Sequence, residues 1–308
     1  MKTVRILLVL LAAAAAPTAG AQPAPAIRVV LLGTGGGPSA NSARGGPSAW
    51  IEAGGERLFV DAGRNAVTRL GEAGLSPRDV TRVFLTHLHS DHVVGLPDLW
   101  LTGWWMFRAA PLEVRGPAGT RDLIENMRKT FAADLDLRTG PPERRDRTTA
   151  AVSGTDIEEG VVFDRNGVRV TAIRVDHGPV PTFGYRIDHA GRSVVFSGDD
   201  RKSDNLIAKS QNVDVLFHNV SGYTPEQLRE EGRIGDGRRA ATQLLASPEE
   251  AAAVFAGSRC KVAVVIHATP RATYEDRLRA GFTGRLEIPD DLTEVLVGED
   301  VILKTVKR

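Results

Sequence analysis

The chain has 308 residues, of which 25% are charged, and its formal net charge is +1. This length suits one large α/β domain or two small ones, and the near-neutral charge gives no indication of a nucleic-acid partner. The single cysteine, Cys260, excludes an internal disulfide. Because Cys260 begins an apolar run, we interpret it as a core residue rather than a nucleophile or a metal ligand.

The N-terminus has the layout of a secretory signal peptide. Lys2 and Arg5 precede the apolar run 6–16, and the small residues 19–21 form a cleavage site. The alternative, an uncleaved membrane anchor, is disfavoured because the run is short and the cleavage site follows at once. We therefore predict a signal peptide over 1–21 and a mature, exported hydrolase domain over 22–308. The domain would be periplasmic in a Gram-negative source and would keep no stable membrane anchor.

The first predicted strand, 27–32, ends in the glycine-rich stretch 33–37. No helix with Lys-Ser/Thr follows this stretch, so a phosphate-binding loop is disfavoured. We expect instead a tight turn that lets the backbone approach a metal centre. Strands at 48–52 and 56–60 then form a hairpin around Gly54-Gly55.

Asp61 follows the second strand of this hairpin, and a helix is predicted over 65–73. Two roles remain open for Asp61. Its carboxylate could orient a ligand histidine, or it could cap the helix.

The seven residues Thr86–His92 carry three histidines and one carboxylate in the spacing His-x-His-x-Asp-His. A predicted strand over 80–85 leads into them, and the alternation of side chains sends His87 and His89 to the same side. Asp91 and His92 follow at the turn. Since zinc prefers imidazole nitrogen and carboxylate oxygen, this loop could supply ligands to two neighbouring metal positions.

Three of the four tryptophans, Trp100, Trp104 and Trp105, lie just after this motif, in a segment that begins as a helix near Val93. Some of them must pack in the core. At least one could instead form an apolar wall of the substrate pocket, which would suit a flat or lipophilic substrate.

A strand at 112–115 and a helix at 120–132 come next. The polar stretch 133–160 is predicted to be a surface loop or lid that shapes specificity, with its arginines in a solvated charge run.

The second half of the chain repeats one arrangement, in which an apolar strand ends at a chemically active side chain. The predicted strands are 167–175, 183–187, 193–196, 213–217 and 262–266, with helices at 203–210 and from Ser247. Over the whole chain, the residues at or just after strand ends are His87, His89, His177, Asp199, His218 and His267. Open sheets build their sites at such ends, whereas His189 lies at a hairpin turn and is expected to be exposed and uninvolved.

These residues divide into two metal sites. One takes His87, His89 and His177, and the other takes Asp91, His92 and His267. Asp199 can bridge them through its two oxygens. The predicted cofactor is a pair of zinc ions, although manganese and iron accept similar ligands. A hydroxide between the two metals would attack an ester-like or amide-like centre.

The motif 86–92, together with His177, Ser197-Gly198-Asp199 and His267, resembles the metal-binding motifs of the metallo-β-lactamase fold superfamily. The resemblance covers residues 27–308. It implies an α/β fold built as a four-layer αββα sandwich with a dinuclear zinc site.

Within that superfamily the chain resembles the ribonuclease Z and arylsulfatase branch through Leu32-Gly33-Thr34-Gly35 and the segment 177–187. The spacing from His177 to Asp199 is too short for the tRNA-gripping arm of the tRNA-processing enzymes. Their Gly-His-Ser-Thr stretch is also missing, because residues 244–248 read Leu-Leu-Ala-Ser-Pro.

The resemblance also assigns catalytic roles. His218 stands where the ribonuclease Z family has His-Glu-Ala, proposed to handle the leaving-group proton, but here Asn219 replaces the acidic residue. We take His218 and Asp91 as the candidate catalytic residues.

The stretch 85–104 is most similar to the arylsulfatases of this fold. The main prediction is therefore an exported arylsulfatase-like hydrolase of a small ester, without a nucleic-acid partner and with its oligomeric state left open. One alternative is a phosphodiesterase acting on cyclic nucleotides or small phosphodiesters. Others are a lactonase or β-lactamase, and an exported zinc-binding module whose site is silent.

Overall fold

The structure is a computed structural model that describes residues 25–37, 43–224 and 243–306. The predicted signal peptide, 1–21, lies outside these residues, so export remains a prediction. Within the described ranges, no helix is both long enough and apolar enough to cross a membrane.

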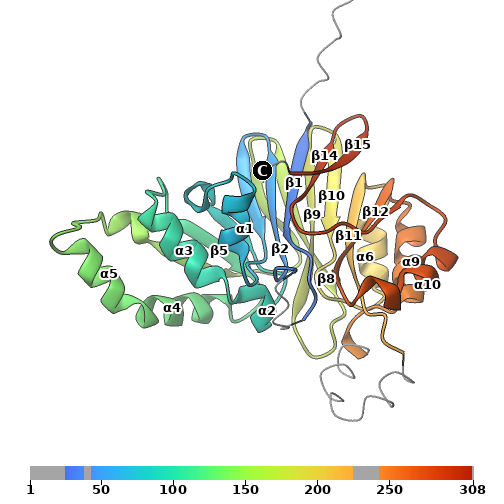
Figure 1. The fold of residues 1–308 in the computed structure, drawn as a ribbon, viewed down its shortest axis with the longest axis horizontal. Coiled ribbons are helices and arrows are strands. Elements are labelled where there is room, and N and C mark those ends of the chain that lie inside the picture. Colours follow the sequence, from blue (N-terminus) through green and yellow to red (C-terminus); the bar gives the residue numbers. More distant parts are fainter. Residues whose placement is uncertain (1–24, 38–42, 225–242, 307–308) are drawn as a thin grey trace, which may run out of the picture.

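The first sheet contains eight strands and joins the two ends of the chain. Its strands are β1 (Ile27–Gly33), β2 (Ser48–Ala53), β3 (Glu56–Val60), β4 (Arg82–Phe84), β5 (Leu112–Gly116), β6 (Val152–Asp156), β14 (Thr293–Val297) and β15 (Val301–Thr305). Their order is β15-β14-β1-β2-β3-β4-β5-β6 (Figure 1). β1 pairs antiparallel with both β2 and β14, whereas β3 to β6 run parallel.

The second sheet contains seven strands, and its parallel part carries the later candidate ligands. Its strands are β7 (Gly160–Arg165), β8 (Val168–Val175), β9 (Thr182–His189), β10 (Arg192–Phe196), β11 (Val215–Val220), β12 (Val262–Ala268) and β13 (Leu286–Glu287). They lie in the order β13-β12-β11-β10-β9-β8-β7. β10 to β13 are parallel, and β7 to β10 are antiparallel.

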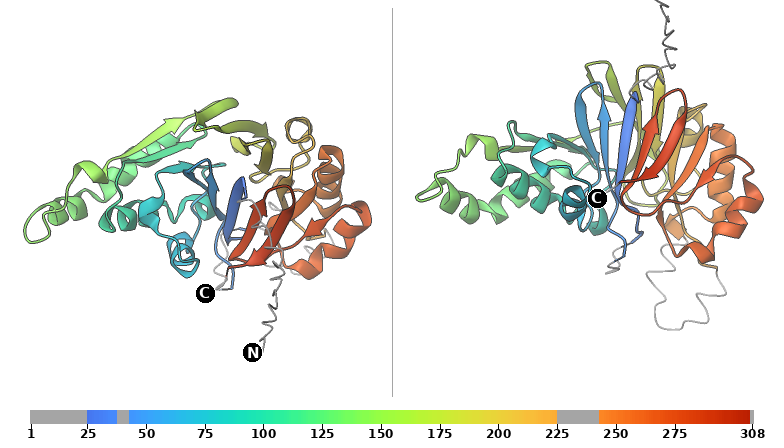
Figure 2. Two further views of the ribbon diagram at one scale, coloured as in Figure 1. Left: turned by 90° about the horizontal axis from the view of Figure 1, so that it is seen from above. Right: turned by 45° about the horizontal axis from the view of Figure 1, so that its top comes forward.

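Helices cover the outer face of each sheet (Figures 1 and 2). On the side of the first sheet these are α1 (Ala66–Glu72), α2 (Ser90–Val93), α3 (Leu96–Trp105), α4 (Thr120–Thr130) and α5 (Ala132–Thr139). On the side of the second sheet they are α6 (Asp204–Lys209), α9 (Pro248–Ser258) and α10 (Glu275–Gly281). Short 3-10 turns are η1 (Pro77–Asp79), η2 (Thr148–Ala150) and η3 (Arg271–Thr273).

Side-chain alternation explains why the two sheets stack between helices. Along β1, Val29 and Leu31 belong to the apolar layer between the sheets, whereas Val30 and Leu32 pack with the helices outside. Successive strand residues point to opposite faces, so an apolar run of this length is buried on both sides. The predicted αββα sandwich is confirmed, with two mixed sheets flanked by helices.

The stretch 133–160 is not the continuous loop that was predicted. It contains most of α5, the turn η2 and the strand β6, which pairs with β5 in the parallel direction. The polar composition concealed β6 because an edge strand with only Val152 buried needs few apolar residues.

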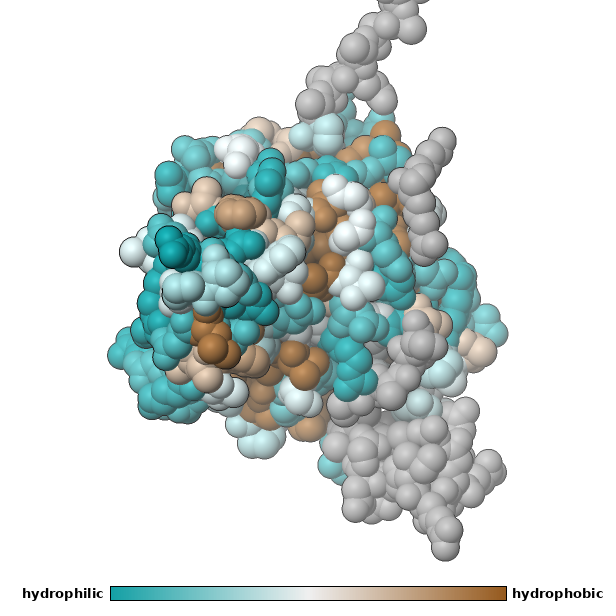
Figure 3. Space-filling view, turned by 60° about the vertical axis from the view of Figure 1, so that its left-hand side comes forward, coloured by the Kyte–Doolittle hydropathy of each residue, from teal (hydrophilic) through white to brown (hydrophobic). Residues whose placement is uncertain are grey.

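The predicted pocket role of the tryptophans is wrong for Trp100 and Trp104. Both are buried against the first sheet, where their indole Nε1–H groups donate to the carbonyls of Ala150 (2.8 Å) and Asp146 (3.0 Å). The four-residue spacing on α3 turns both toward the sheet. Trp105 is 49% exposed. The face of the molecule that carries the helices of the first sheet is mainly hydrophilic, with separate apolar patches (Figure 3).

Candidate metal centre

The loops that follow β3, β4, β8 and β10 meet the last residues of β12 at one edge of the sandwich. The two sheets are joined there: the Phe183 N–H donates to the Thr86 carbonyl (2.9 Å), and the Tyr185 hydroxyl donates to the Leu85 carbonyl (2.7 Å). The motif 86–92 therefore lies on the seam between the sheets. The structure gathers the seven predicted ligand residues at this seam.

The first ligand group consists of His87, His89 and His177. The Nδ1 atom of His89 lies 3.0 Å from His87 Nε2 and 3.3 Å from His177 Nε2. Three ring nitrogens converge on one point, as the predicted assignment requires.

The second ligand group consists of Asp91, His92 and His267. Asp91 Oδ2 lies 3.2 Å from His267 Nε2 and 3.7 Å from His92 Nε2. His267 stands within the last residues of β12 with a left-handed backbone, φ 46°, which turns the chain at this position.

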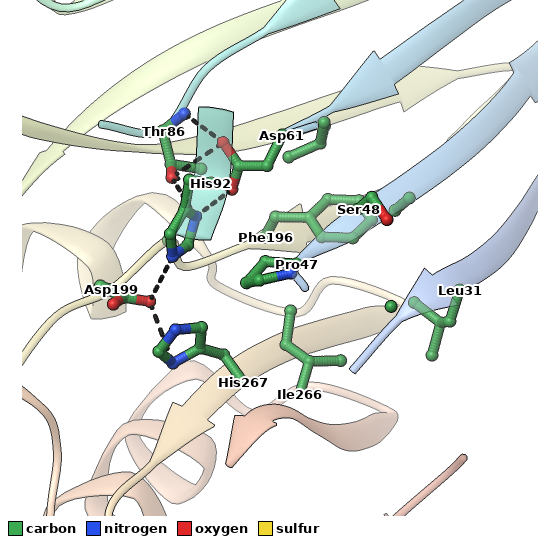
Figure 4. Close-up of a pocket in the computed structure, with 14 residues that line it drawn as sticks. Leu31, Pro47, Ser48, Asp61, Thr86, His92, Phe196, Asp199, Ile266 and His267 are labelled. Carbon is green, nitrogen blue, oxygen red and sulfur yellow. Dashed lines mark hydrogen bonds and ion pairs between the residues drawn. The ribbon is translucent and has the colours of Figure 1, made fainter. Parts of the chain in front are cut away.

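Asp199 lies between the two groups, and Figure 4 shows its contacts with His92 and His267 of the second group. Its Oδ1 atom is 3.5 Å from His92 Nε2 and 3.3 Å from His267 Nδ1. Its Oδ2 atom faces the other way, 3.9 Å from His87 Nε2. A carboxylate with one oxygen toward each group is placed to bridge two ions.

The electrostatic environment favours the protonation states that metal ligands need at Asp199 and His87. At His92 it does not, because burial alone would lower the pKa but the carboxylates of Asp199 and Asp61 raise it well above its ordinary value. Burial alone would raise the pKa of Asp199, but the imidazoles of His267, His92 and His87 hold that pKa well below its usual value. Burial and the neighbouring histidines lower the pKa of His87 well below its ordinary value. An ionised carboxylate and a neutral imidazole are the forms that coordinate metals.

Unpaired atoms support a cation at this point. Buried polar atoms normally have a hydrogen-bond partner. His92 Nε2, Asp199 Oδ1 and His267 Nδ1 are buried without a hydrogen bond and only face one another at 3.5 Å and 3.3 Å, and all three residues line the same small cavity. Two divalent ions would satisfy these atoms, and the donor set of imidazole and carboxylate suits zinc, with manganese or iron as alternatives.

The cavity drawn in Figure 4 is not a substrate pocket. It has a volume of about 20 Å³, enough for roughly one water molecule, and it lies behind Asp199 among Ser48, Thr86 and Phe196.

Asp61 lies behind His92 rather than at a helix end. Its Oδ2 accepts from His92 Nδ1 (2.8 Å), and its Oδ1 accepts from the Thr86 N–H (2.8 Å). The N-cap of α1 is Asn65, so the alternative role of Asp61 as a helix cap is excluded. The geometry favours the role of orienting a ligand histidine.

The other histidines are held by groups that the sequence did not reveal. The Thr86 hydroxyl lies 3.1 Å from His87 Nδ1, and the Leu244 carbonyl accepts from His177 Nδ1 (2.9 Å). Thr86 is the first residue of the motif, directly before His87, so its hydroxyl could have been identified from the sequence. Leu244 acts through its backbone, so no side-chain pattern could have identified it.

Glycines let three backbone segments pack behind the motif. A Cβ atom on Gly95 would lie 2.2 Å from the Gly63 carbonyl oxygen, and one on Gly63 would lie 2.5 Å from the Asp91 carbonyl oxygen. Only glycine allows this approach.

The glycine-rich turn after β1 does reach the ligand groups, as expected. The Gly37 N–H lies 3.3 Å from His267 Nε2. Asp291 fixes the turn by accepting from the N–H groups of Thr34 (2.8 Å) and Gly45 (2.6 Å).

His218 does not belong to either ligand group. It is completely buried within β11, with Nδ1 2.7 Å from the Asn219 carbonyl oxygen and Nε2 3.2 Å from Asp200 Oδ1. Burial lowers the pKa of His218 to about 4. Asp200 supplies the acidic neighbour that Asn219 does not provide in the sequence. The complete burial of His218 nevertheless does not support its predicted role as a proton donor to the leaving group.

Comparisons with known proteins agree with this geometry. A family model described as anti-Pycsar protein Apyc1 matches residues 27–228. Ribonuclease Z from Mycobacterium sp. (strain KMS) is 33% identical over 294 residues, which cover 90% of this chain and 99% of that protein.

Two solved structures share the fold. The short form of human tRNase Z has a TM-score of 0.64 at 24% identity, over 88% of this chain and 99% of that one. A diphosphatase from the PhnP family has a TM-score of 0.64 at 15% identity, over 90% of this chain and 100% of that one.

Proposed function

Because the chain belongs to the metallo-β-lactamase fold hydrolases related to ribonuclease Z and Apyc1, we propose that it is a dinuclear-zinc phosphodiesterase acting on small phosphodiesters, cyclic nucleotides included. Membership of this family makes the chain a metal-dependent hydrolase of phosphoester bonds. The small-substrate class and the identity of the metal are the proposed parts.

The observation that carries the proposal is the position of Asp199 between two complete ligand groups. Two zinc ions held there would supply Lewis acidity, which activates water near neutral pH and offsets charge on the phosphoryl oxygens. Asp199 holds the two positions together. Asp91, placed beside His92 and His267, is proposed to accept the proton of the attacking water at its carboxylate.

The short connection between His177 and Asp199 favours a small substrate. The spacing from His177 to Asp199 leaves no room for a tRNA-gripping arm, because β9 and β10 fill it as a hairpin. Relatives named ribonuclease Z favour a phosphodiester centre over the sulfate ester that the sequence alone favoured. The predicted arylsulfatase activity has no support from the comparisons.

One assay panel tests the proposal. The purified protein is offered bis-p-nitrophenyl phosphate, a 3′,5′-cyclic nucleotide, p-nitrophenyl sulfate, a lactone and nitrocefin. We expect hydrolysis of the two phosphodiesters, its loss in chelator and its recovery with zinc. Asp199→Ala should abolish turnover, whereas Asp164→Ala, which removes an exposed carboxylate paired with Arg169, should not.

Other outcomes would identify a different function. Turnover of the sulfate ester alone would restore the arylsulfatase prediction, and turnover of the lactone or nitrocefin alone would point to those hydrolases. Two bound zinc ions without any turnover would indicate a binding module with a silent site.

A further inference from the structure

Asn219 lies behind both ligand groups and is completely buried within β11. Its amide Nδ2 donates toward the Asp200 side chain Oδ1 (2.7 Å) and lies within hydrogen-bond distance of the carbonyls of Asp200 (3.0 Å) and Gly198 (3.2 Å). Gly198 and Asp200 are the two neighbours of Asp199. One amide group therefore holds the turn that carries the bridging carboxylate on both sides.

The other end of the same side chain holds a different segment. Asn219 Oδ1 accepts from the Ala246 N–H (3.2 Å), and the Ser221 N–H donates to the Ala246 carbonyl (2.8 Å). Two residues before Ala246, the Leu244 carbonyl accepts from His177 Nδ1. The position of that carbonyl, and so the orientation of His177, depends on how this segment is fixed.

We propose that Asn219 is a positioning residue that links the two ligand groups. Its donor side fixes the Asp199 turn, and its acceptor side fixes the segment that orients His177. Loss of the amide therefore loosens Asp199, which both metal positions share, and His177, which belongs to the first ligand group. Backbone hydrogen bonds of Ser197 to Phe217 and of Arg201 to Asp176 remain, so the loss is partial.

The chemistry of the amide explains why asparagine stands here. All three groups that face Nδ2 are acceptors, and the group that faces Oδ1 is a donor. A carboxylate would keep the acceptor side but would set an oxygen against three other oxygens. The proposal therefore predicts that aspartate fails at this position although it has the same shape.

The experiment measures metal affinity in the full chain, without any substrate. Wild type, Asn219→Ala and Asn219→Asp are stripped of metal and titrated with zinc against a chromophoric chelator. Removing partners that orient ligands costs about 10–100-fold in metal affinity. We expect both stepwise dissociation constants to rise by this factor in Asn219→Ala, and by at least as much in Asn219→Asp.

Asp214→Ala is the matched control. Asp214 is buried just before β11, at the end of the strand opposite to Asn219, and accepts from the Ser193 N–H (2.9 Å) and Lys261 (2.6 Å). Its loss should lower the stability of the metal-free protein without changing zinc affinity. Asn205→Ala, which removes a partly exposed asparagine with two hydrogen bonds, should change neither.

Two results would overturn the inference: zinc constants within about threefold of wild type in Asn219→Ala, or an equal loss of affinity in Asp214→Ala. If Asn219→Ala does not fold, Asn219→Asp decides by the same criteria, because it preserves the side-chain volume. The inference rests on the metal site of the proposed function. Absence of zinc binding in the wild type would contradict that function, whereas wild-type affinity in the variants contradicts only the role of Asn219.

Discussion

The ring nitrogen that faces away from the ligand group is held by a different chemical group in three of the candidate histidines. His87 has a hydroxyl, His92 a carboxylate and His177 a backbone carbonyl. Such a partner fixes the tautomer and the ring orientation, and an anionic partner also makes the imidazole a stronger donor. His92 is the histidine with the carboxylate, so its environment depends most directly on one replaceable side chain.

Asp61→Ala should therefore lower zinc affinity by about 10–100-fold, because His92 loses its carboxylate and the Thr86 backbone loses an acceptor. Zinc content after dialysis against a weak chelator measures the change. Asp188→Ala removes a carboxylate paired with Arg186 on the second sheet and should leave the zinc content unchanged. Full retention of zinc in Asp61→Ala would mean that His92 is oriented by its packing alone.

The sequence predicted the metal ligands best where their side chains lie close together along the chain. The motif from His87 to His92 shows its ligands by spacing, and Asp199 and His267 follow apolar strands. Leu244 left no such signal, and Asn219 stood out only as a departure from the His-Glu-Ala stretch of the ribonuclease Z family. Their contributions depend on segments that meet only in the folded sandwich.

Single elements differ in how much change they tolerate, and the glycines show the extremes. Gly95 precedes α3 and packs against the backbone of the segment that follows β3, whereas a Cβ on Gly71, within α1, would meet nothing within 4 Å. The same substitution should thus have opposite effects at the two positions.

Gly95→Ala should destabilise the protein by about 1–3 kcal/mol, as overpacking does, and should weaken zinc binding because the displaced segment carries His92. Gly71→Ala should stabilise it by roughly 0.5–1 kcal/mol, since alanine is the better helix residue. Urea unfolding of both variants measures the difference. Equal stabilities would show that the segments behind the motif relax freely.

The α10 helix should respond to acid through Glu275. Hydrogen bonds from Arg271, together with Arg279, lower the pKa of Glu275 from 4.5 to about 2. Because the folded-state pKa is depressed, the stabilisation is present above pH 4.5 and is lost as the pH falls toward 2. Glu275→Gln should cost about 0.2–1 kcal/mol at pH 7 and progressively less below pH 4. A cost that does not fall with pH in urea unfolding would refute this linkage.

Element boundaries were predictable where a strand is buried on both faces and less so at the sheet edge. β1 and β12 are apolar throughout. β6 was missed because its place is fixed by pairing with β5, far away in sequence, rather than by its own composition. The pocket role predicted for Trp100 and Trp104 failed for a related reason. Both lie near the motif along the chain, but the helix directs their side chains toward the first sheet.

For the whole molecule, the candidate metal centre draws its ligands from both sheets, which also meet through an apolar layer and through the hydrogen bonds of Phe183 and Tyr185. His87, His89, Asp91 and His92 come from the first sheet, and His177, Asp199 and His267 from the second. Ions bound there would thus connect both sheets at this edge.

Removal of metal should lower the unfolding temperature of the whole protein, with recovery when zinc is added. A ligand at a hundred times its dissociation constant adds about 2.7 kcal/mol to the free energy of unfolding. Calorimetry with and without chelator measures the effect, and Asp199→Ala should show little of it. Identical unfolding temperatures with and without chelator would mean that the ions contribute nothing to holding the sheets together.

The pairing of β1 with β14 also bears on how the protein is made. β1 leaves the ribosome long before its partner β14, which follows it by more than 250 positions in the chain. His267 is added 180 residues after His87, a delay of roughly 9–36 s at about 5–20 residues per second. During that time the nascent chain presents four strong metal donors without their counterparts. Assembly of both ligand groups must therefore wait at least until His267 has been added.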